Sequence, residues 1–151
     1  MSARLDAKLV APGGLKALLG LQAYVNQTGL EPALLELVKI RSSQINGCAF
    51  CLAMHHRDAR KMGERAERLD LLPAWEEAPL YTPRERAALA WTEAVTLVAD
   101  GHVPDAVYAK ARQEFSEKEL VDLTYAVIAI NCWNRINVAF RTPPDLPAHN
   151  A

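Results

Sequence analysis

The sequence has little net charge and no long hydrophobic run. Its 151 residues include 17 Lys and Arg against 18 Asp and Glu, and both signs are scattered along the chain. Without a basic or acidic surface, we expect no nucleic acid and no anionic lipid as a partner. The longest apolar stretch near the C-terminus is AVIAI, far below the roughly 20 residues that span a bilayer. We therefore expect no membrane segment.

The beginning of the sequence also lacks the apolar region of an export signal. MSARLDAKLVAPGG carries charges at Arg4, Asp6 and Lys8 and has no continuous apolar region of that kind. The chain has three cysteines, an odd number, and without export these are better explained as thiols, redox groups or metal ligands than as structural disulfides. We expect a cytoplasmic protein.

Sustained period-two alternation, the mark of a half-buried strand, is missing as well. Apolar residues recur at helical spacing almost everywhere, and half of all residues are hydrophobic. The length suits one domain with a substantial core and is short for two. The sequence predicts an all-α protein in which residues 1–151 form a single domain.

Turn and cap residues divide the chain into helices. Residues 15–25 form a first helix, and a second starts at Glu31-Pro32, with Leu34, Leu37, Val38 and Ile45 as its core stripe. The segment SQING, residues 43–47, predicts a break, after which a third helix runs from just before Cys48 to about Met62. Residues 64–81 read as a short helix and a connecting loop.

Two capping boxes mark later helices. Thr82 with Glu85 starts one that stops near Asp100-Gly101, and its expected buried face is Ala88, Trp91, Val95 and Val98. Another helix follows Pro104. Ser116 with Glu119 starts a helix that is apolar nearly all round over residues 120–130, which indicates a central or oligomer-buried position. NCWNRINVAF then continues or kinks this helix.

The segment INGCAFCLAMHH, residues 45–56, contains the most reactive residue types of the sequence, cysteine and histidine, close together. If this segment is helical, Cys48, Cys51 and His55 share one face. Helical residues three apart have Cα atoms roughly 5 Å apart, which a disulfide tolerates. The helix N-terminus and the imidazole both favour a thiolate. Because His55 follows Cys51 by one turn, Cys51 is the expected nucleophile and Cys48 its resolving partner.

The preceding helix supplies a carboxylate, Glu36, among apolar neighbours. If it is buried, desolvation raises its pKa, and it can orient His55 and exchange protons with it. The hypothesis is a relay from Glu36 through His55 to Cys51.

Other interpretations of these residues remain open. A zinc site would need Cys132 or His102 to complete the set, and the two cysteines can also be simple buried residues. His56 points away from this face and is expected at the surface or behind the site. A thioredoxin-like module is disfavoured because no strand precedes the motif.

Residues 36–64, ELVKIRSSQINGCAFCLAMHHRDARKMGE, strongly resemble the core motif of AhpD-like alkylhydroperoxidases, within the carboxymuconolactone decarboxylase superfamily. The order is the same: a glutamate, SQIN, the cysteine pair, and a histidine after three further residues. Residues 131–141, NCWNRINVAFR, also resemble the C-terminal helix of that family, so that the similarity extends over residues 15–141.

The resemblance implies an all-helical fold that assembles into trimers or hexamers. It also implies a peroxidase in which Cys51 attacks a hydroperoxide and Cys48 closes a disulfide, with Glu36 and His55 as the proton relay. The implied reductant is an external dithiol such as a dihydrolipoamide-bearing protein. No metal, haem or other cofactor is implied.

One position departs from the family pattern. AhpD enzymes have a second histidine immediately before the nucleophile, where this chain has Phe50. A slower peroxidase, a different oxidant or a mainly thiol-disulfide role would each be compatible with that loss.

Two other functions stay open beside the peroxidase. The decarboxylase branch of the superfamily typically lacks the cysteine pair, so that Cys48 and Cys51 argue against that branch. A non-enzymatic oligomer could use the dithiol to sense redox state or hold zinc, and an acid/base enzyme could use Glu36 or His55 with incidental cysteines. Residues of the C-terminal helix can line a pocket or an interface, or simply pack, namely Asn131, Trp133, Asn134 and Arg135.

Overall fold

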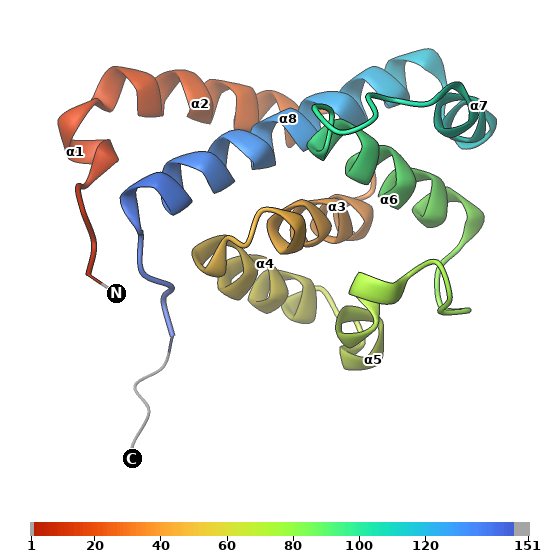
Figure 1. Cartoon of the computed structure of the whole chain (residues 1–151), viewed down its shortest axis with the longest axis horizontal. Helices are drawn as coiled ribbons and strands as arrows, with labels where there is room; N and C mark the ends of the chain where they lie inside the picture. Colours follow the sequence, from red (N-terminus) through yellow and green to blue (C-terminus); the bar gives the residue numbers. More distant parts are fainter. Residues whose placement is uncertain (1, 147–151) are drawn as a thin grey trace.

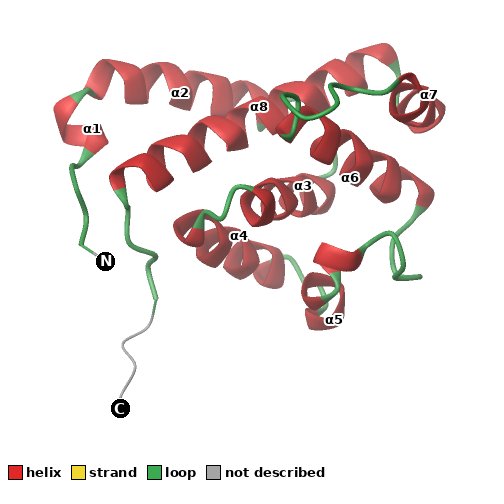
Figure 2. Cartoon of the chain, viewed as in Figure 1, coloured by secondary structure: helices red, strands yellow, loops and turns green. Residues whose placement is uncertain are grey.

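The computed structural model of the chain describes residues 2–146, and every regular element among them is a helix (Figures 1 and 2). The prediction of an all-α protein is confirmed. In chain order the helices are α1 (Ala7–Val10), α2 (Pro12–Val25), α3 (Pro32–Ile45), α4 (Ala49–Lys61), α5 (Ala66–Asp70), the 3-10 turn η1 (Leu72–Ala74), α6 (Pro83–Thr96), α7 (Asp105–Glu114) and α8 (Glu117–Phe140).

Helix α3 lies at the centre of the bundle, in contact with α4, α6 and α8 (Figure 1). Its apolar residues are spread around the helix, so that both sides are buried: Leu34 and Val38 belong to one core cluster, and Leu37 and Ile40 to another. A helix that is apolar on several faces is expected in such a position. The carboxylate of Glu36 is buried with them because it sits on this central helix.

Both capping boxes are present as predicted. The side chain of Thr82 accepts from the backbone N–H of Glu85, while Glu85 accepts from the N–H of Thr82, and Ser116 with Glu119 repeats the arrangement. Each such cap stabilises its helix by about 1 kcal/mol. Helix α8 then continues without a break through residues 131–140, so that the polar C-terminal segment is aligned with its apolar first half.

Some predicted boundaries are wrong. Helix α3 continues through Ile45, so the break comes at Asn46-Gly47, where the φ of Gly47 is +64°. Helix α6 ends at Thr96 and not near Asp100, because the chain turns away from Leu97 onward. Val98 is consequently 51% exposed, although the sequence pattern placed it on the buried face.

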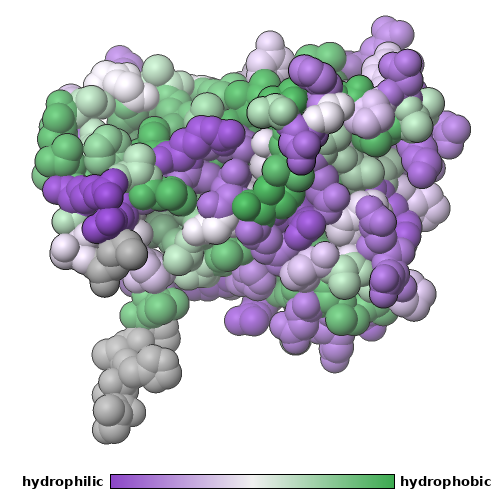
Figure 3. All heavy atoms as spheres, viewed as in Figure 1, coloured by the Kyte–Doolittle hydropathy of each residue, from purple (hydrophilic) through white to green (hydrophobic). Residues whose placement is uncertain are grey.

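Hydrophobic surface gathers around α1 and α2, whereas the side bearing α7 is mostly hydrophilic (Figure 3). The exposed large hydrophobic side chains in the α1 and α2 region are Leu5, Leu9, Val10, Leu19 and Tyr24. No helix within residues 2–146 is both long and apolar enough to cross a bilayer.

Candidate functional site

Cys48 lies immediately before α4, where it is the N-cap. Its backbone is extended, with φ −87° and ψ 95°, and its Sγ accepts from the backbone N–H of Cys51 at 3.4 Å. The prediction that both cysteines lie inside the helix is therefore wrong for Cys48. The chain must turn sharply at Asn46-Gly47 to reach α4, which puts Cys48 in the turn and Cys51 in the first helical turn.

A buried polar network holds this turn against α8. The amide of Asn46 donates to Oδ1 of Asn131 at 3.0 Å and to Oδ1 of Asn134 at 2.9 Å. Asn134 in turn donates to Oγ of Ser43 at 3.0 Å, and the Ser43 hydroxyl donates to the carbonyl of Lys39 at 2.7 Å. Because satisfied buried networks fix geometry, the SQIN segment and the polar end of α8 together position Cys48.

The two sulfurs are in contact. Sγ of Cys48 and Sγ of Cys51 are 2.8 Å apart, both residues are buried, and neither forms a disulfide. They pack with Ile130, Phe50 and Trp133 in a small cluster of their own. The convergence expected from the C-x-x-C spacing is confirmed, and a bond between these sulfurs requires little movement.

One negative charge is favoured on this pair. The pKa of Cys48 falls to about 7, chiefly because the Cys51 thiol donates to its sulfur, with the backbone N–H of Cys51 helping and burial opposing. The same hydrogen bond, together with burial and the charge on Cys48, raises the pKa of the Cys51 thiol. At rest the thiolate therefore lies on Cys48, although the sequence favoured Cys51 through its nearness to His55.

His55 is held by a carboxylate from the neighbouring helix. Nδ1 of His55 is 2.8 Å from Oε2 of Glu36, and both residues are buried. The other carboxylate oxygen, Oε1, is 2.7 Å from Nζ of Lys39 one turn along α3. Glu36 thus contacts both a cation and an imidazole. Because Nδ1 of His55 is paired with Glu36, Nε2 is the ring nitrogen that can exchange a proton with another group.

The protonation predicted for Glu36 is wrong. Burial acts to raise its pKa, but the hydrogen bond with His55 and the positive charge of Lys39 outweigh burial and leave the pKa below its usual range. Glu36 is therefore a carboxylate at neutral pH that orients the imidazole through the contact with Nδ1. It is not a neutral acid that carries protons.

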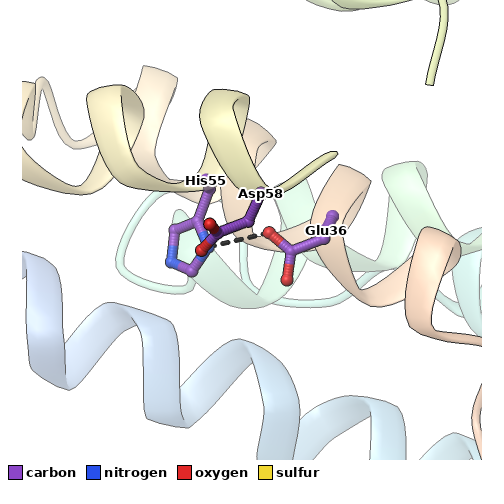
Figure 4. A group of neighbouring side chains, drawn as sticks. All are labelled: Glu36, His55 and Asp58. Atoms are coloured by element: carbon purple, nitrogen blue, oxygen red, sulfur yellow. Dashed lines mark hydrogen bonds and ion pairs between the residues drawn. The ribbon is translucent and has the colours of Figure 1, made fainter. Parts of the chain in front are cut away.

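Asp58 completes a group of three potential metal ligands with Glu36 and His55 (Figure 4). Their ligand atoms lie within 4.8 Å of one another. Among the described residues, Cys48 and Cys51 belong to no such group. The zinc site that would combine them with Cys132 or His102 is therefore not formed in this structure. Both Glu36 oxygens already have partners in Lys39 and His55, which a cation would have to displace.

A pocket of about 420 Å³ opens beside Cys51 and His55. Nδ2 of Asn137 lies on its wall, 3.5 Å from Sγ of Cys51. The remaining lining is mostly apolar and comes from α1, α2, α3, α4 and α8: Lys8, Leu15, Leu19, Gln22, Lys39, Phe50, Met54 and Trp133. A molecule bound here would contact Cys51, His55 and a mostly apolar wall that also contains Lys8, Gln22 and Lys39.

The other residues that the sequence singled out have varied positions. Trp133 lines the pocket, whereas Asn131 and Asn134 are buried in the network behind Cys48. His56 is half-buried, with Nδ1 2.9 Å from the carbonyl of Leu52 in the same helix. Cys132 is half-buried and has a free thiol.

Sequence reasoning missed Lys39, Asp58 and Asn137. Lys39 follows Glu36 by three residues and Asp58 follows His55 by three, which is the spacing of neighbours on a helix. That signal was available for both. Asn137 reaches Cys51 only through the packing of α8 on α4, which no local pattern indicates.

Comparison with known proteins identifies the family. The carboxymuconolactone decarboxylase family profile matches residues 12–94. The uncharacterized protein YdfG of Bacillus subtilis is 44% identical over 139 residues, covering 92% of this chain and 95% of its own. The chain belongs to the carboxymuconolactone decarboxylase family.

Solved structures agree with this assignment. An Agrobacterium tumefaciens protein of unknown function, considered a candidate antioxidant defence protein AhpD, superposes with a TM-score of 0.94 at 40% identity. That match covers 97% of this chain and 100% of the other. The debrominase Bmp8 superposes with a TM-score of 0.79 at 19% identity, covering 89% and 72%, which shows a shared fold alone. The AhpD-like resemblance of residues 36–64 is confirmed.

Proposed function

We propose that the protein is a thiol peroxidase that reduces hydroperoxides through a Cys48–Cys51 dithiol and disulfide cycle. The observation that carries this proposal is the 2.8 Å contact between the two sulfurs, at the edge of a pocket that also contains His55. Free thiols with this reactivity belong in a reducing compartment, so we propose a cytoplasmic location.

The first step uses Cys51 because it is the cysteine that lines the pocket with His55. The charge at rest lies on Cys48, and proton transfer across the 2.8 Å contact, or to Nε2 of His55, exposes a Cys51 thiolate to the substrate. This thiolate attacks an oxygen of the hydroperoxide and breaks the O–O bond. The departing alkoxide takes up the proton, so that thiol and hydroperoxide become sulfenic acid and alcohol.

The second step uses Cys48 because of its lowered pKa. Its thiolate attacks the sulfur of the Cys51 sulfenic acid, the S–O bond breaks, and hydroxide leaves as water after taking up a proton. An external dithiol then supplies two electrons and two protons to reopen the disulfide. No metal or other cofactor enters this cycle.

The pocket supports organic hydroperoxides as substrates. Leu15, Leu19, Met54 and Trp133 offer contacts to an apolar body that hydrogen peroxide lacks. Phe50 adds to this apolar wall where AhpD enzymes have a histidine. We therefore expect larger hydroperoxides to react faster than hydrogen peroxide.

We also propose a homo-oligomer, trimeric or hexameric as the family resemblance implies. Val121, Tyr125 and Ile128 are exposed on α8 at spacings of four and three residues, which is one apolar stripe of that helix. A second copy of this chain is the partner that an unpaired stripe of this kind fits.

The two cysteines can be tested separately. After treatment with cumene hydroperoxide, Cys48→Ser should hold one sulfenic acid per chain, trapped at Cys51 and located by mass spectrometry. Cys51→Ser should lose turnover. Full turnover by Cys51→Ser, or turnover by wild-type protein after both thiols are alkylated, would overturn the proposal in favour of acid/base chemistry. Stoichiometric zinc in the purified protein would overturn it in favour of a metal-holding role.

A further inference from the structure

The two cysteines of the site are buried, and each lines a different pocket. Cys51 lines the pocket that contains His55, whereas Cys48 lines a second pocket of about 350 Å³ at the C-terminal end of α8. We call this second pocket the C-terminal groove. Its walls are Gly47, Ala49, Phe50, Asn137, Val138, Arg141, Thr142, Pro143 and Pro144.

Phe50 and Asn137 are the residues that line both spaces. They therefore form the partition between the His55 pocket and the C-terminal groove. Phe50 lies between the two cysteines in sequence, and Asn137 donates to Cys51 from α8. A bulky apolar residue at position 50 keeps the two openings separate, which gives the family departure at this position a structural role.

We propose that the external dithiol enters by the C-terminal groove and attacks Sγ of Cys48, while the hydroperoxide enters by the His55 pocket. This inference rests on the proposed dithiol and disulfide cycle. It assigns oxidation and reduction to opposite sulfurs and separate entrances, so that the reductant does not compete with the hydroperoxide for the His55 pocket.

Thiol-disulfide exchange that begins with attack on Cys48 can regenerate both thiols. A thiolate of the reductant bonds to Sγ of Cys48, the S–S bond breaks, and Cys51 leaves as a thiolate. That thiolate is released beside Asn137 and the imidazole of His55, where the next hydroperoxide binds. The second thiol of the reductant then attacks the mixed disulfide, which releases Cys48 and the oxidised reductant.

Cys51 is a suitable leaving group at this stage. Its pKa in the reduced pair is raised mainly by its hydrogen bond to Cys48 and by burial, with the charge on Cys48 adding to both. When Cys48 is part of a mixed disulfide, it has no charge. The hydrogen bond and the charge of Cys48 then no longer raise the pKa of Cys51. The amide of Asn137, which lowers the pKa of Cys51, remains.

The groove fits a slender aliphatic dithiol. Ala49, Val138, Pro143 and Pro144 make most of its walls apolar, and the buried Cys48 is among its lining residues. An aliphatic chain with terminal thiols, such as dihydrolipoamide, matches both the lining and the reactive sulfur.

Two matched tryptophan substitutions separate the entrances. Val138 is 48% exposed in the C-terminal groove, and Leu19 is 50% exposed in the His55 pocket, so each change adds bulk to one opening without filling the core. Two half-reactions are measured by rapid thiol trapping: oxidation of reduced protein by cumene hydroperoxide, and reduction of diamide-oxidised protein by dihydrolipoamide.

Val138→Trp should slow reduction by about tenfold and leave oxidation within about twofold, because exchange depends on access to the attacked sulfur. Leu19→Trp should give the opposite pattern. Ala49→Leu provides a second block of the groove if Val138→Trp does not fold. The inference is overturned if Leu19→Trp slows reduction, or if neither groove variant does.

Diamide keeps this test independent of the proposed function. Diamide takes two electrons and two protons from the dithiol and forms the disulfide without any hydroperoxide. If cumene hydroperoxide fails to oxidise wild-type protein, the peroxidase proposal fails, while the reduction half-reaction still reports which sulfur is attacked.

Discussion

Oε2 of Glu36 and Nδ1 of His55 are 2.8 Å apart, although the two residues come from different helices and both are buried. The pairing fixes the ring of a histidine that lines the same pocket as Cys51. An imidazole oriented by a carboxylate is a common arrangement for a group that accepts and returns a proton. The predictions begin with this pair.

Glu36→Gln should slow the oxidation of Cys51 by about a hundredfold, in the range typical of general acid and base groups. The amide still occupies the space but cannot stabilise an imidazolium by charge. The measurement is the rate of thiol loss with cumene hydroperoxide in single-turnover conditions. Glu31→Gln, at the exposed start of the same helix, is the matched control and should react at the wild-type rate.

Lys39→Met should shift to higher pH the step that Glu36 adds to the pH profile of activity, which lies below the thiolate step near pH 7. The pKa of Glu36 lies below its usual range partly because of the Lys39 charge. A carboxylate with a lowered pKa keeps its charge until the pH falls through that value, and without Lys39 burial raises the pKa again. Activity would then be lost at a less acidic pH. Lys39→Arg should restore the wild-type profile, and an unchanged profile in Lys39→Met would refute this role.

The reactivity of Cys48 should depend on pH with a midpoint of about 7. Below that value the thiolate fraction falls about tenfold per pH unit, and above it the rate of alkylation by iodoacetamide reaches a plateau. Cys51→Ala removes the thiol that donates to Cys48, so its midpoint should rise toward 9, the ordinary value. Peptide mapping identifies which cysteine is alkylated. Equal midpoints in the two proteins would contradict the pairing.

Asn134→Ala should lower the stability of the protein and also change the position of the turn that holds Cys48. Its amide bridges Asn46 and Ser43, and removal leaves buried partners unsatisfied at a cost of about 1–3 kcal/mol. Chemical unfolding measures the loss of stability, and the alkylation midpoint of Cys48 reports on the turn. Gln27→Ala, at an exposed position, is the control. If the variant is less stable but the pH midpoint of Cys48 alkylation is unchanged, the network stabilises the fold and does not position Cys48.

Ile128→Glu should dissociate the proposed oligomer, because it places a charge at one end of the exposed apolar stripe on α8. Light scattering gives the mass in solution for the wild-type and variant chains. Val98→Glu adds the same charge at another exposed apolar position and should leave the mass unchanged. A wild-type protein that is already monomeric would refute the interface.

The helices were largely predictable because their ends carry local signals. Thr82 and Ser116 cap α6 and α8 through contacts with residues three positions away, which a sequence displays directly. The C-x-x-C spacing likewise implied that the sulfurs meet. Val98 was misplaced because α6 ends early, and helix ends without a side-chain cap have no comparable signal.

The electrostatics of the site were less predictable because they depend on contacts between helices and on details of a turn. The pKa of Glu36 is set by two partners, and burial alone predicts the wrong direction of its shift. The thiolate at rest belongs to Cys48 because this residue lies in the turn before α4 and its sulfur accepts a hydrogen bond from the Cys51 thiol. Asn137 approaches Cys51 only after α8 has packed on α4.

The most direct test mixes reduced wild-type protein with one equivalent of cumene hydroperoxide and measures both products. The account predicts one cumyl alcohol per chain and the loss of two hydrogens from the protein, with the new disulfide mapped to Cys48 and Cys51. Intact hydroperoxide beside unmodified thiols, or alcohol formed while both thiols stay free, would contradict it.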